Sequence, residues 1–299
     1  MTEQTAFDMT SAGIHPATHM GHVHYTVADL NRQAAFYSEI LGFKELWREG
    51  KTAGLGAGTR ELLRLTELPG ARRAHGTTGL YHTAFLVPSR WDLAHLIRRI
   101  AESQIPIQGH SNHGTHLAMY LPDAEGNGIE LAWDFPKEKW PMRDGKMSLA
   151  DMPRSGIDLD DLMGVLQSDT REWTGLADET VVGHVHLHVA DIPPAEGFYH
   201  RLLGFDIIMN SPEFRALFLS AGGYHHHIGT NVWQGVGAPP QPEDATGLRY
   251  FSVVVPDGDE LERVKARAVA AGLPVEAHPD GALLRDPSRN GVLLTSAIT

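Results

Sequence analysis

The chain lacks cysteine altogether, and this absence limits both its cross-links and its metal chemistry. Without cysteine there are no disulfide bonds and no thiolate ligands, so a metal ion could be bound only through nitrogen and oxygen atoms. Histidine is a natural nitrogen ligand, and the chain has 18 histidines. Their positions in the sequence must therefore show which of them could meet at one ion.

The chain also lacks a long apolar run and an excess of positive charge. No apolar run approaches the roughly 20 residues of a membrane-spanning helix. No Lys or Arg precedes an apolar stretch in residues 1–20, as a secretory signal would require. The net charge is −12, and no basic patch typical of nucleic-acid binding is visible. We therefore expect a cytoplasmic protein that binds neither membranes nor nucleic acid.

A repeat divides the chain into two similar halves. Its length of 299 residues suggests about two domains, and several segments recur 162 residues later. The recurring pairs are Gly21–Leu30 with Gly183–Ile192, Phe36–Tyr37 with Phe198–Tyr199, and Leu41–Phe43 with Leu203–Phe205. A constant spacing over so many positions indicates duplication of one folding unit.

A second set of repeats shows that each half contains two modules. The recurring pairs are Gly79–Leu80 with Gly247–Leu248, Val87–Pro88 with Val255–Pro256, and Asn127–Ile129 with Asn290–Val292. The four modules lie near residues 20–68, 79–135, 182–235 and 246–297. We expect an N-terminal domain at 20–135, a linker at 136–181 with a short helix at Leu159–Leu166, and a C-terminal domain at 182–297.

Each module begins with an alternating pattern that predicts a β-strand followed by a helix. His22, His24 and Thr26 share one face of the first strand, and apolar residues share the other. Tyr37 and Leu41 then recur about one helical turn apart. Short strands complete the module, which predicts an α+β fold of four βαβββ modules paired into two cups. The histidine-bearing face should line a cavity, because unpaired histidines would be costly to bury against helices.

The repeated pattern Gly-His-Val-His, Asp-Leu, Phe-Tyr and Leu-Gly-Phe resembles the vicinal-oxygen-chelate superfamily. That superfamily includes glyoxalase I, the fosfomycin and bleomycin resistance proteins, and the extradiol dioxygenases. The segments 79–88, 123–131 and 222–229 resemble the catechol-2,3-dioxygenase branch in particular. The resemblance implies ring cleavage of a catechol-type aromatic diol by O2 at a mononuclear Fe(II) site, with Mn(II) as the alternative metal.

The resemblance also implies metal ligands on the first and last strands of paired modules. In the N-terminal half these positions carry His22, His82 and Glu130. Two histidines and one carboxylate are the donor set of non-haem Fe(II) oxygenases. In the C-terminal half Tyr250 stands in place of His82 and Leu293 in place of Glu130. We therefore expect the metal in the N-terminal half and a structural role for the C-terminal half.

Further site residues are implied by the same resemblance. Tyr120 lies ten residues before Glu130, the spacing of a tyrosine that donates a hydrogen bond to the substrate. His113 is the expected acid–base residue, with His110 and His116 as alternatives, and His24 is expected to line the substrate pocket. The run Tyr224–His227 is expected to form a hydrogen-bonded polar core and to bind no metal.

Two other functions remain open from the sequence. One is a different metal-dependent enzyme of the superfamily, such as a glyoxalase or an epimerase. The other is a non-catalytic protein that binds small aromatic compounds. A complete ligand set together with Tyr120 argues against the binding protein. A glyoxalase would usually carry a second carboxylate at the end of the first module, and there Glu61 is expected at the strand edge with Leu63 nearer the site, which disfavours that enzyme. The ring substituents of the diol are not readable, and a homo-oligomer is possible.

Overall fold

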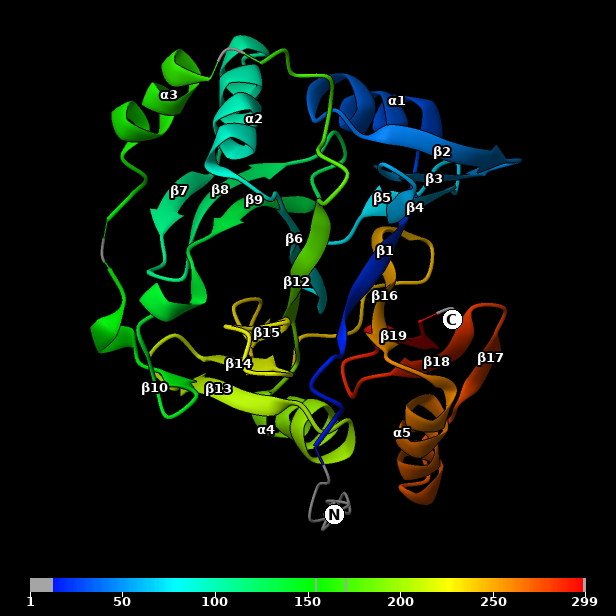
Figure 1. Cartoon of the computed structure of the whole chain (residues 1–299). Helices are drawn as coiled ribbons and strands as arrows, with labels where there is room; N and C mark the ends of the chain where they lie inside the picture. The colour runs from blue at the N-terminus through cyan, green and yellow to red at the C-terminus, as the bar shows by residue number, and fades with distance from the viewer. Residues whose placement is uncertain (1–12, 154, 170, 298–299) are drawn as a thin grey trace.

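The computed structural model describes residues 13–153, 155–169 and 171–297, which form two large mixed sheets with helices packed on their outer faces (Figure 1). The first sheet has the strand order β17-β18-β19-β16-β1-β4-β3-β2, with β5 paired to β16. Its strands are β1 His19–Val27, β2 Lys44–Glu49, β3 Thr52–Ala57, β4 Arg60–Glu67, β5 Arg72–Arg73, β16 Ala245–Val255, β17 Glu276–His278, β18 Gly281–Arg285 and β19 Gly291–Ser296.

The second sheet has the order β13-β14-β15-β12-β6-β9-β8-β7 and carries most of the histidines of interest. Its strands are β6 Gly79–Leu86, β7 Gly109–Asn112, β8 His116–Pro122, β9 Gly128–Asp134, β12 Val181–His188, β13 Asp206–Ser211, β14 Ala216–Ser220 and β15 Ile228–Asn231. A small hairpin of β10 Met142–Arg143 and β11 Lys146–Met147 lies in the connection between the halves. The predicted α+β fold of four modules in two half-barrels is confirmed.

The helices follow the predicted pattern, with one local difference. They are α1 Leu30–Ala35, α2 Arg90–Glu102, α3 Leu159–Ser168, α4 Ile192–Glu196 and α5 Gly258–Ala270. Both α1 and α4 continue as a π-helical turn, Phe36–Ile40 and Gly197–Leu202. The wider turn keeps the buried Tyr37 and Tyr199 in the core, where each hydroxyl donates to a buried aspartate, Asp123 or Asp286 respectively.

The pairing of modules differs from the one expected from the sequence. Strand β1 pairs antiparallel with β16, so that His24 lies opposite Tyr250. Strand β6 pairs antiparallel with β12, so that His82 lies opposite His186. The first module therefore shares a half-barrel with the fourth, and the second with the third. The repeat shows that the four modules are alike. It does not show which modules pair, because the edge strand of one module can hydrogen-bond with the edge strand of any other.

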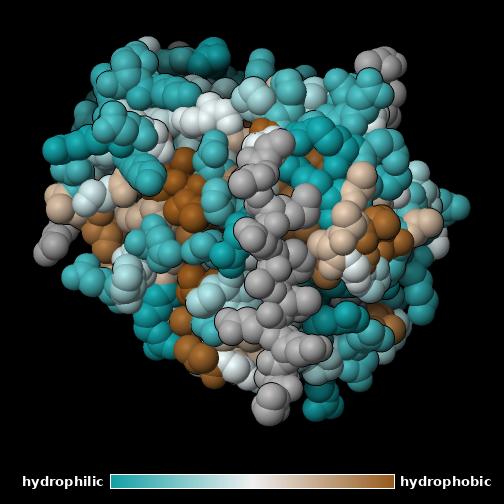
Figure 2. Space-filling view, turned by 90° about the horizontal axis from the view of Figure 1, so that it is seen from below, coloured by the Kyte–Doolittle hydropathy of each residue, from teal (hydrophilic) through white to brown (hydrophobic). Residues whose placement is uncertain are grey.

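No membrane-spanning helix is found in the described part of the chain, where the longest helices, α2 and α5, have 13 residues each. The face seen in Figure 2 shows hydrophobic residues in small groups among hydrophilic ones. The predicted helix in the linker is confirmed as α3, which packs beside α2. The linker residues before it pass over the open side of the second sheet and so become part of the site described next.

Candidate metal centre

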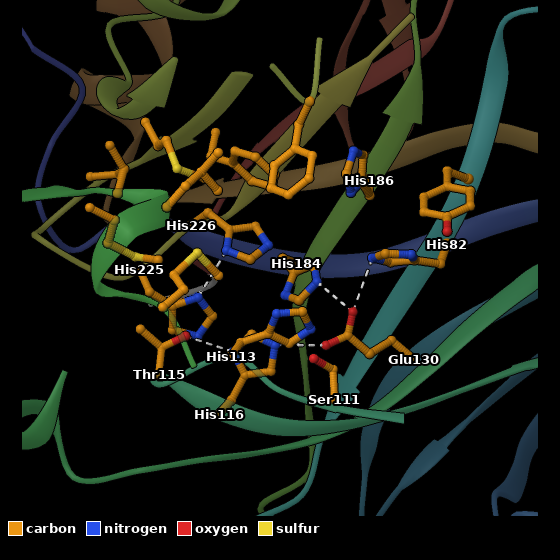
Figure 3. Close-up of a pocket in the computed structure, with 18 of the residues that line it drawn as sticks. His82, Ser111, His113, Thr115, His116, Glu130, His184, His186, His225 and His226 are labelled. Carbon is orange, nitrogen blue, oxygen red and sulfur yellow. Dashed lines mark hydrogen bonds and ion pairs between the residues drawn. The ribbon is translucent and has the colours of Figure 1, made fainter. Parts of the chain in front are cut away.

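Three neighbouring strands of the second sheet bring His82, Glu130 and His184 together (Figure 3). His82 lies on β6, which has β12 on one side and β9 on the other. His184 comes from β12 and Glu130 from β9. Because side chains alternate along a strand, the three residues can share the concave face while their neighbours pack in the core.

The distances within this group are those of potential ligands to one ion. Glu130 Oε2 lies 3.0 Å from His82 Nε2 and 3.1 Å from His184 Nε2. One ligand atom from each residue lies within 4.8 Å of the others, and all three residues are buried. Neither ring nitrogen of His82 has a well-aligned hydrogen-bond partner among the described residues, despite the close carboxylate. Such an unpartnered buried nitrogen is explained if it coordinates a metal.

The electrostatics of the group also fit a metal. Burial alone would raise the pKa of the Glu130 carboxyl, but its charge interaction with His184 and hydrogen bonds from the surrounding histidines hold that pKa well below its ordinary value. Burial lowers the pKa of His184. A charged carboxylate and neutral imidazoles are the protonation states that bind divalent cations. The donor set therefore matches a two-histidine, one-carboxylate site with open coordination positions.

His116 holds the second oxygen of Glu130. Its Nε2 donates to Glu130 Oε1 over 2.9 Å, and its Nδ1 lies 2.8 Å from the Thr115 hydroxyl. Since Nε2 carries the proton, Nδ1 accepts from Thr115. This contact leaves Oε2 to face His82 and His184. His116, an alternative to His113 in the sequence analysis, thus orients a ligand, a common role for groups that surround a metal site.

His113 and Tyr120 form a pair beside the ligands, as the sequence predicted for two pocket residues. The Tyr120 hydroxyl lies 2.7 Å from His113 Nε2. Burial raises the pKa of Tyr120 well above its ordinary value, so the hydroxyl keeps its proton. Burial lowers the pKa of His113 to about 3, so its imidazole is neutral. His110, the other alternative, accepts from the backbone of Ile157 and does not line the cavity.

The run at 224–227 contributes a residue to the cavity that the sequence analysis did not select. The ring centroid of His226 lies 4.0 Å from that of His184. His225 Nε2 donates to Asp134 over 3.0 Å, and its Nδ1 lies 2.9 Å from His226 Nδ1. In this arrangement His226 donates from Nδ1, which leaves its Nε2 lone pair unprotonated. His227 instead bonds Ser220 in the polar core expected for this run.

His225 also belongs to a second cluster, with His116 and Asp134. The rings of His116 and His225 are stacked, with centroids 4.7 Å apart and planes at 14°. Imidazole nitrogens donate in the plane of the ring, so two stacked rings do not aim at one ion between them. This cluster is therefore a hydrogen-bonded support for Glu130 and His226.

The structure does not bring His22 to His82 and Glu130, and this corrects the expected ligand set. His22 lies in the other half-barrel, with Nε2 3.4 Å from the Tyr250 hydroxyl. His24, expected in the substrate pocket, lies on the same strand and bonds Thr66 over 2.8 Å. His22 and His24 are far from the candidate ligands because the first module pairs with the fourth. This pairing places His22 near Tyr250 and Leu293, which stand at the repeat positions of His82 and Glu130.

Arg64 occupies this other half-barrel with its own ion pairs. Its guanidinium contacts Glu61 at 2.9 Å and Asp280 at 2.9 Å, and it donates to the Tyr250 hydroxyl over 3.2 Å. A cation is thus already present among the polar side chains there. Together with the buried Leu293, this arrangement differs from the half-barrel that brings His82, Glu130 and His184 together.

His184 is the candidate ligand that sequence reasoning missed, although the repeat contained the signal. It stands at the repeat position of His22. Each half-barrel combines a position on the first strand of one module with two positions of the other module, one on its first strand and one on its last strand. With the observed pairing these are His184, His82 and Glu130 in one barrel. The sequence indicates His226 less clearly than His184, because only the fold shows which histidine of the run 224–227 faces the cavity.

A cavity of about 850 Å³ opens in front of these residues. Its polar end is formed by the ligand group with His113 and His226 (Figure 3), and by Tyr120, which is hydrogen-bonded to His113. Its other end is formed by apolar side chains from the linker and from β13 and β14. A cavity of this size accommodates a small organic ligand.

Comparisons with known proteins agree with this geometry. The family model described as the Glyoxalase/Bleomycin resistance protein/Dioxygenase superfamily matches residues 19–131 and 181–292. A Bacillus subtilis protein named catechol-2,3-dioxygenase is 41% identical over 97% of this chain and 100% of its own length.

Two solved structures show the same fold. The crystal structure of a Bacillus subtilis protein matches with a TM-score of 0.63 and 13% identity, covering 95% of this chain and 86% of that one. Glyoxalase I from Zea mays matches with a TM-score of 0.57 and 19% identity, covering 94% and 92%. Enzymes with different names thus share this architecture, so the side chains of the site must decide the chemistry.

Proposed function

Because the chain belongs to the glyoxalase/bleomycin resistance protein/dioxygenase superfamily, we propose that it is an extradiol dioxygenase. It would open the aromatic ring of a catechol beside the two hydroxyl groups and incorporate both atoms of O2. The observation that supports this most is the buried group of His82, Glu130 and His184 at the polar end of a cavity of about 850 Å³. The full-length similarity to a protein named catechol-2,3-dioxygenase supports the same choice.

We propose Fe(II) as the metal, with Mn(II) as the alternative. His82, Glu130 and His184 would hold it, since their atoms converge and their protonation states suit a divalent cation. When bound, the metal would supply Lewis-acid chemistry for the diol and O2. The protein contributes the shaped cavity and the proton-handling groups around it.

Tyr120 and His113 are proposed to handle protons at the substrate oxygens. The Tyr120 hydroxyl remains protonated and can donate a hydrogen bond to a substrate oxygen. The neutral His113 imidazole, already 2.7 Å from that hydroxyl, can accept a proton from the diol. A positioned acid–base group of this kind typically accelerates a reaction by roughly 10²–10⁴-fold.

His226 is a second candidate for proton transfer. Its ring lies directly beside His184, and its contact with His225 leaves the Nε2 lone pair free to accept a proton. His113 and His226 come from different modules: His113 lies in the turn between β7 and β8, and His226 lies in the segment between β14 and β15. One can act on the proton of a substrate hydroxyl while the other orients the ring.

The proposed activity is tested by adding iron(II) to the protein without oxygen, then catechol, then oxygenated buffer. We expect one O2 consumed for each catechol, with the absorbance of a ring-opened product. Glu130→Ala should lose both the iron and the activity, while His22→Ala should keep both. If the iron-loaded protein binds catechol but consumes no oxygen, it is a binding protein. If it binds no catechol, another reaction of the superfamily takes precedence.

A further inference from the structure

The charge of the cavity is unusual for a site that would accept an acid. Among the lining residues in the described part of the chain there is no lysine and no arginine. The carboxylates that line it are Glu130, in the ligand group, and Glu213, an exposed residue between β13 and β14. The cavity therefore offers no permanent cation apart from a bound metal.

The end of the cavity away from the ligands is apolar on two sides. Met147, Leu149 and Met152 approach from the linker, which crosses the open side of the sheet. Met209, on β13, and Phe218, on β14, approach from the sheet. In the view of Figure 3 the sulfur atoms lie on the side of the pocket away from Glu130 and His82. Methionine side chains are flexible and can pack around ligands of different shape.

The volume is larger than an unsubstituted ring requires. Cavities of roughly 300–1,000 Å³ hold drug-sized ligands, and this one measures about 850 Å³. If the diol is held at the ligand group, the rest of the ring points toward the apolar end. Space remains there for a substituent.

From this lining we propose that the substrates are catechols with an uncharged apolar substituent, alkyl or aryl, and that catechols bearing a carboxylate are excluded. This inference rests on the proposed function of the site. An apolar substituent would be removed from water against methionine and phenylalanine side chains. A carboxylate would lose its hydration without gaining a cationic partner. Glu213 adds like-charge repulsion at the rim.

The test compares three catechols with the iron-loaded protein: catechol itself, an ethylcatechol, and a carboxymethylcatechol of similar size, each substituted at ring position 3 or 4. Dissociation constants are measured by calorimetry without oxygen, and kcat/KM with oxygen. We expect the ethyl compounds to exceed the carboxylated ones by at least roughly tenfold in both quantities, since one methylene in an apolar pocket is worth roughly 10–200-fold. Equal values, or a preference for the carboxylate, would overturn the inference.

Two variants supply the missing cation. Met152→Arg places a guanidinium in the half-buried linker, and Met209→Arg places one on β13. Each should improve the carboxylated catechol by roughly tenfold and weaken the ethyl compound. Met152→Leu and Met209→Leu are matched controls that keep the wild-type preference. If both arginine variants fold and neither changes the preference for the ethyl compound over the carboxylated one, the apolar end does not contact the substituent and the inference is wrong.

The two failures are distinguishable. If all catechols bind but none is opened, the proposed function fails, while the dissociation constants still decide the selectivity. If catechol is opened and the ethyl and carboxymethyl compounds are opened at equal kcat/KM, the function holds and the selectivity fails. If no catechol binds, both are overturned.

Discussion

At the scale of single residues, the site depends on two histidines that approach the ligand group from different modules. His113 contacts Tyr120, and His226 contacts His184 and His225. The sequence suggested the first through the resemblance of the loop before Tyr120, with His110 and His116 as alternatives. It did not identify the second, because three consecutive histidines alternate between the two faces of an extended chain. Only the packing of the run against β12 decides which of them faces the cavity.

The roles of these histidines are separable by substitution. His113→Ala should retain iron and bind catechol without oxygen, because His113 is not a ligand. Its ring-opening rate should fall by roughly 10²–10⁴-fold. The same measurement on His226→Ala decides between the two. A normal rate in His113→Ala with a large loss in His226→Ala would transfer the acid–base role to His226.

Replacing His116 should change the affinity for the metal and not the proton transfer at the substrate. It donates to Glu130 Oε1, and residues that support a ligand in this way typically change metal affinity by roughly 10–100-fold when replaced. His116→Ala should therefore weaken iron binding by that amount, measured by competition with a chelator. His116→Gln, which can still donate a hydrogen bond, should recover part of it. Unchanged affinity in His116→Ala would show that Glu130 is held in place without it.

At the scale of elements, the sequence predicted the strands, the helices and the four modules, because the repeat and the alternating pattern specify local structure. It placed His82 and Glu130 correctly relative to each other, since both belong to one module. It placed His22 with them because neighbouring modules were expected to pair. Which strand pairs with β1 or with β6 depends on the packing of the whole chain. The residue pattern of each strand is equally compatible with either pairing of the modules, so the pattern alone does not decide between them.

The same repeat position carries a candidate metal ligand in one half-barrel and an apolar core residue in the other. Leu293 is fully buried where Glu130 stands in the other barrel. Leu293→Ala should lower the free energy of unfolding by about 2–5 kcal/mol, the usual cost of such a cavity. Its iron content and its kcat should stay at the wild-type level. Urea denaturation and metal analysis measure both, and loss of iron in a folded Leu293→Ala protein would show that the first sheet also takes part in metal binding.

At the scale of the whole molecule, buried histidines couple stability to pH. Burial lowers the pKa of His22 to about 4 and that of His24 to about 2, against about 6.5 in an unfolded chain. The unfolded state therefore binds more protons on acidification. The stabilisation is complete above about pH 6.5 and is lost as the pH falls from there toward the folded pKa values.

We expect the metal-free protein to lose stability between pH 6.5 and 5. Each such histidine contributes up to about 1.4 kcal/mol per pH unit. Urea denaturation at several pH values measures the slope. His24→Gln should reduce that slope by up to one proton, whatever its effect on stability at pH 7. An unchanged slope in this variant would show that His24 is not held neutral in the folded protein.

One metal site is proposed to span both halves of the chain, with ligands from the second and third modules. It is tested most directly by anomalous diffraction at the iron edge from crystals grown without oxygen. We predict one strong peak, bonded to His82, Glu130 and His184, which disappears in His184→Ala and persists in His22→Ala. A peak at His22, or a peak that survives the loss of His184 and not that of His22, would contradict the account.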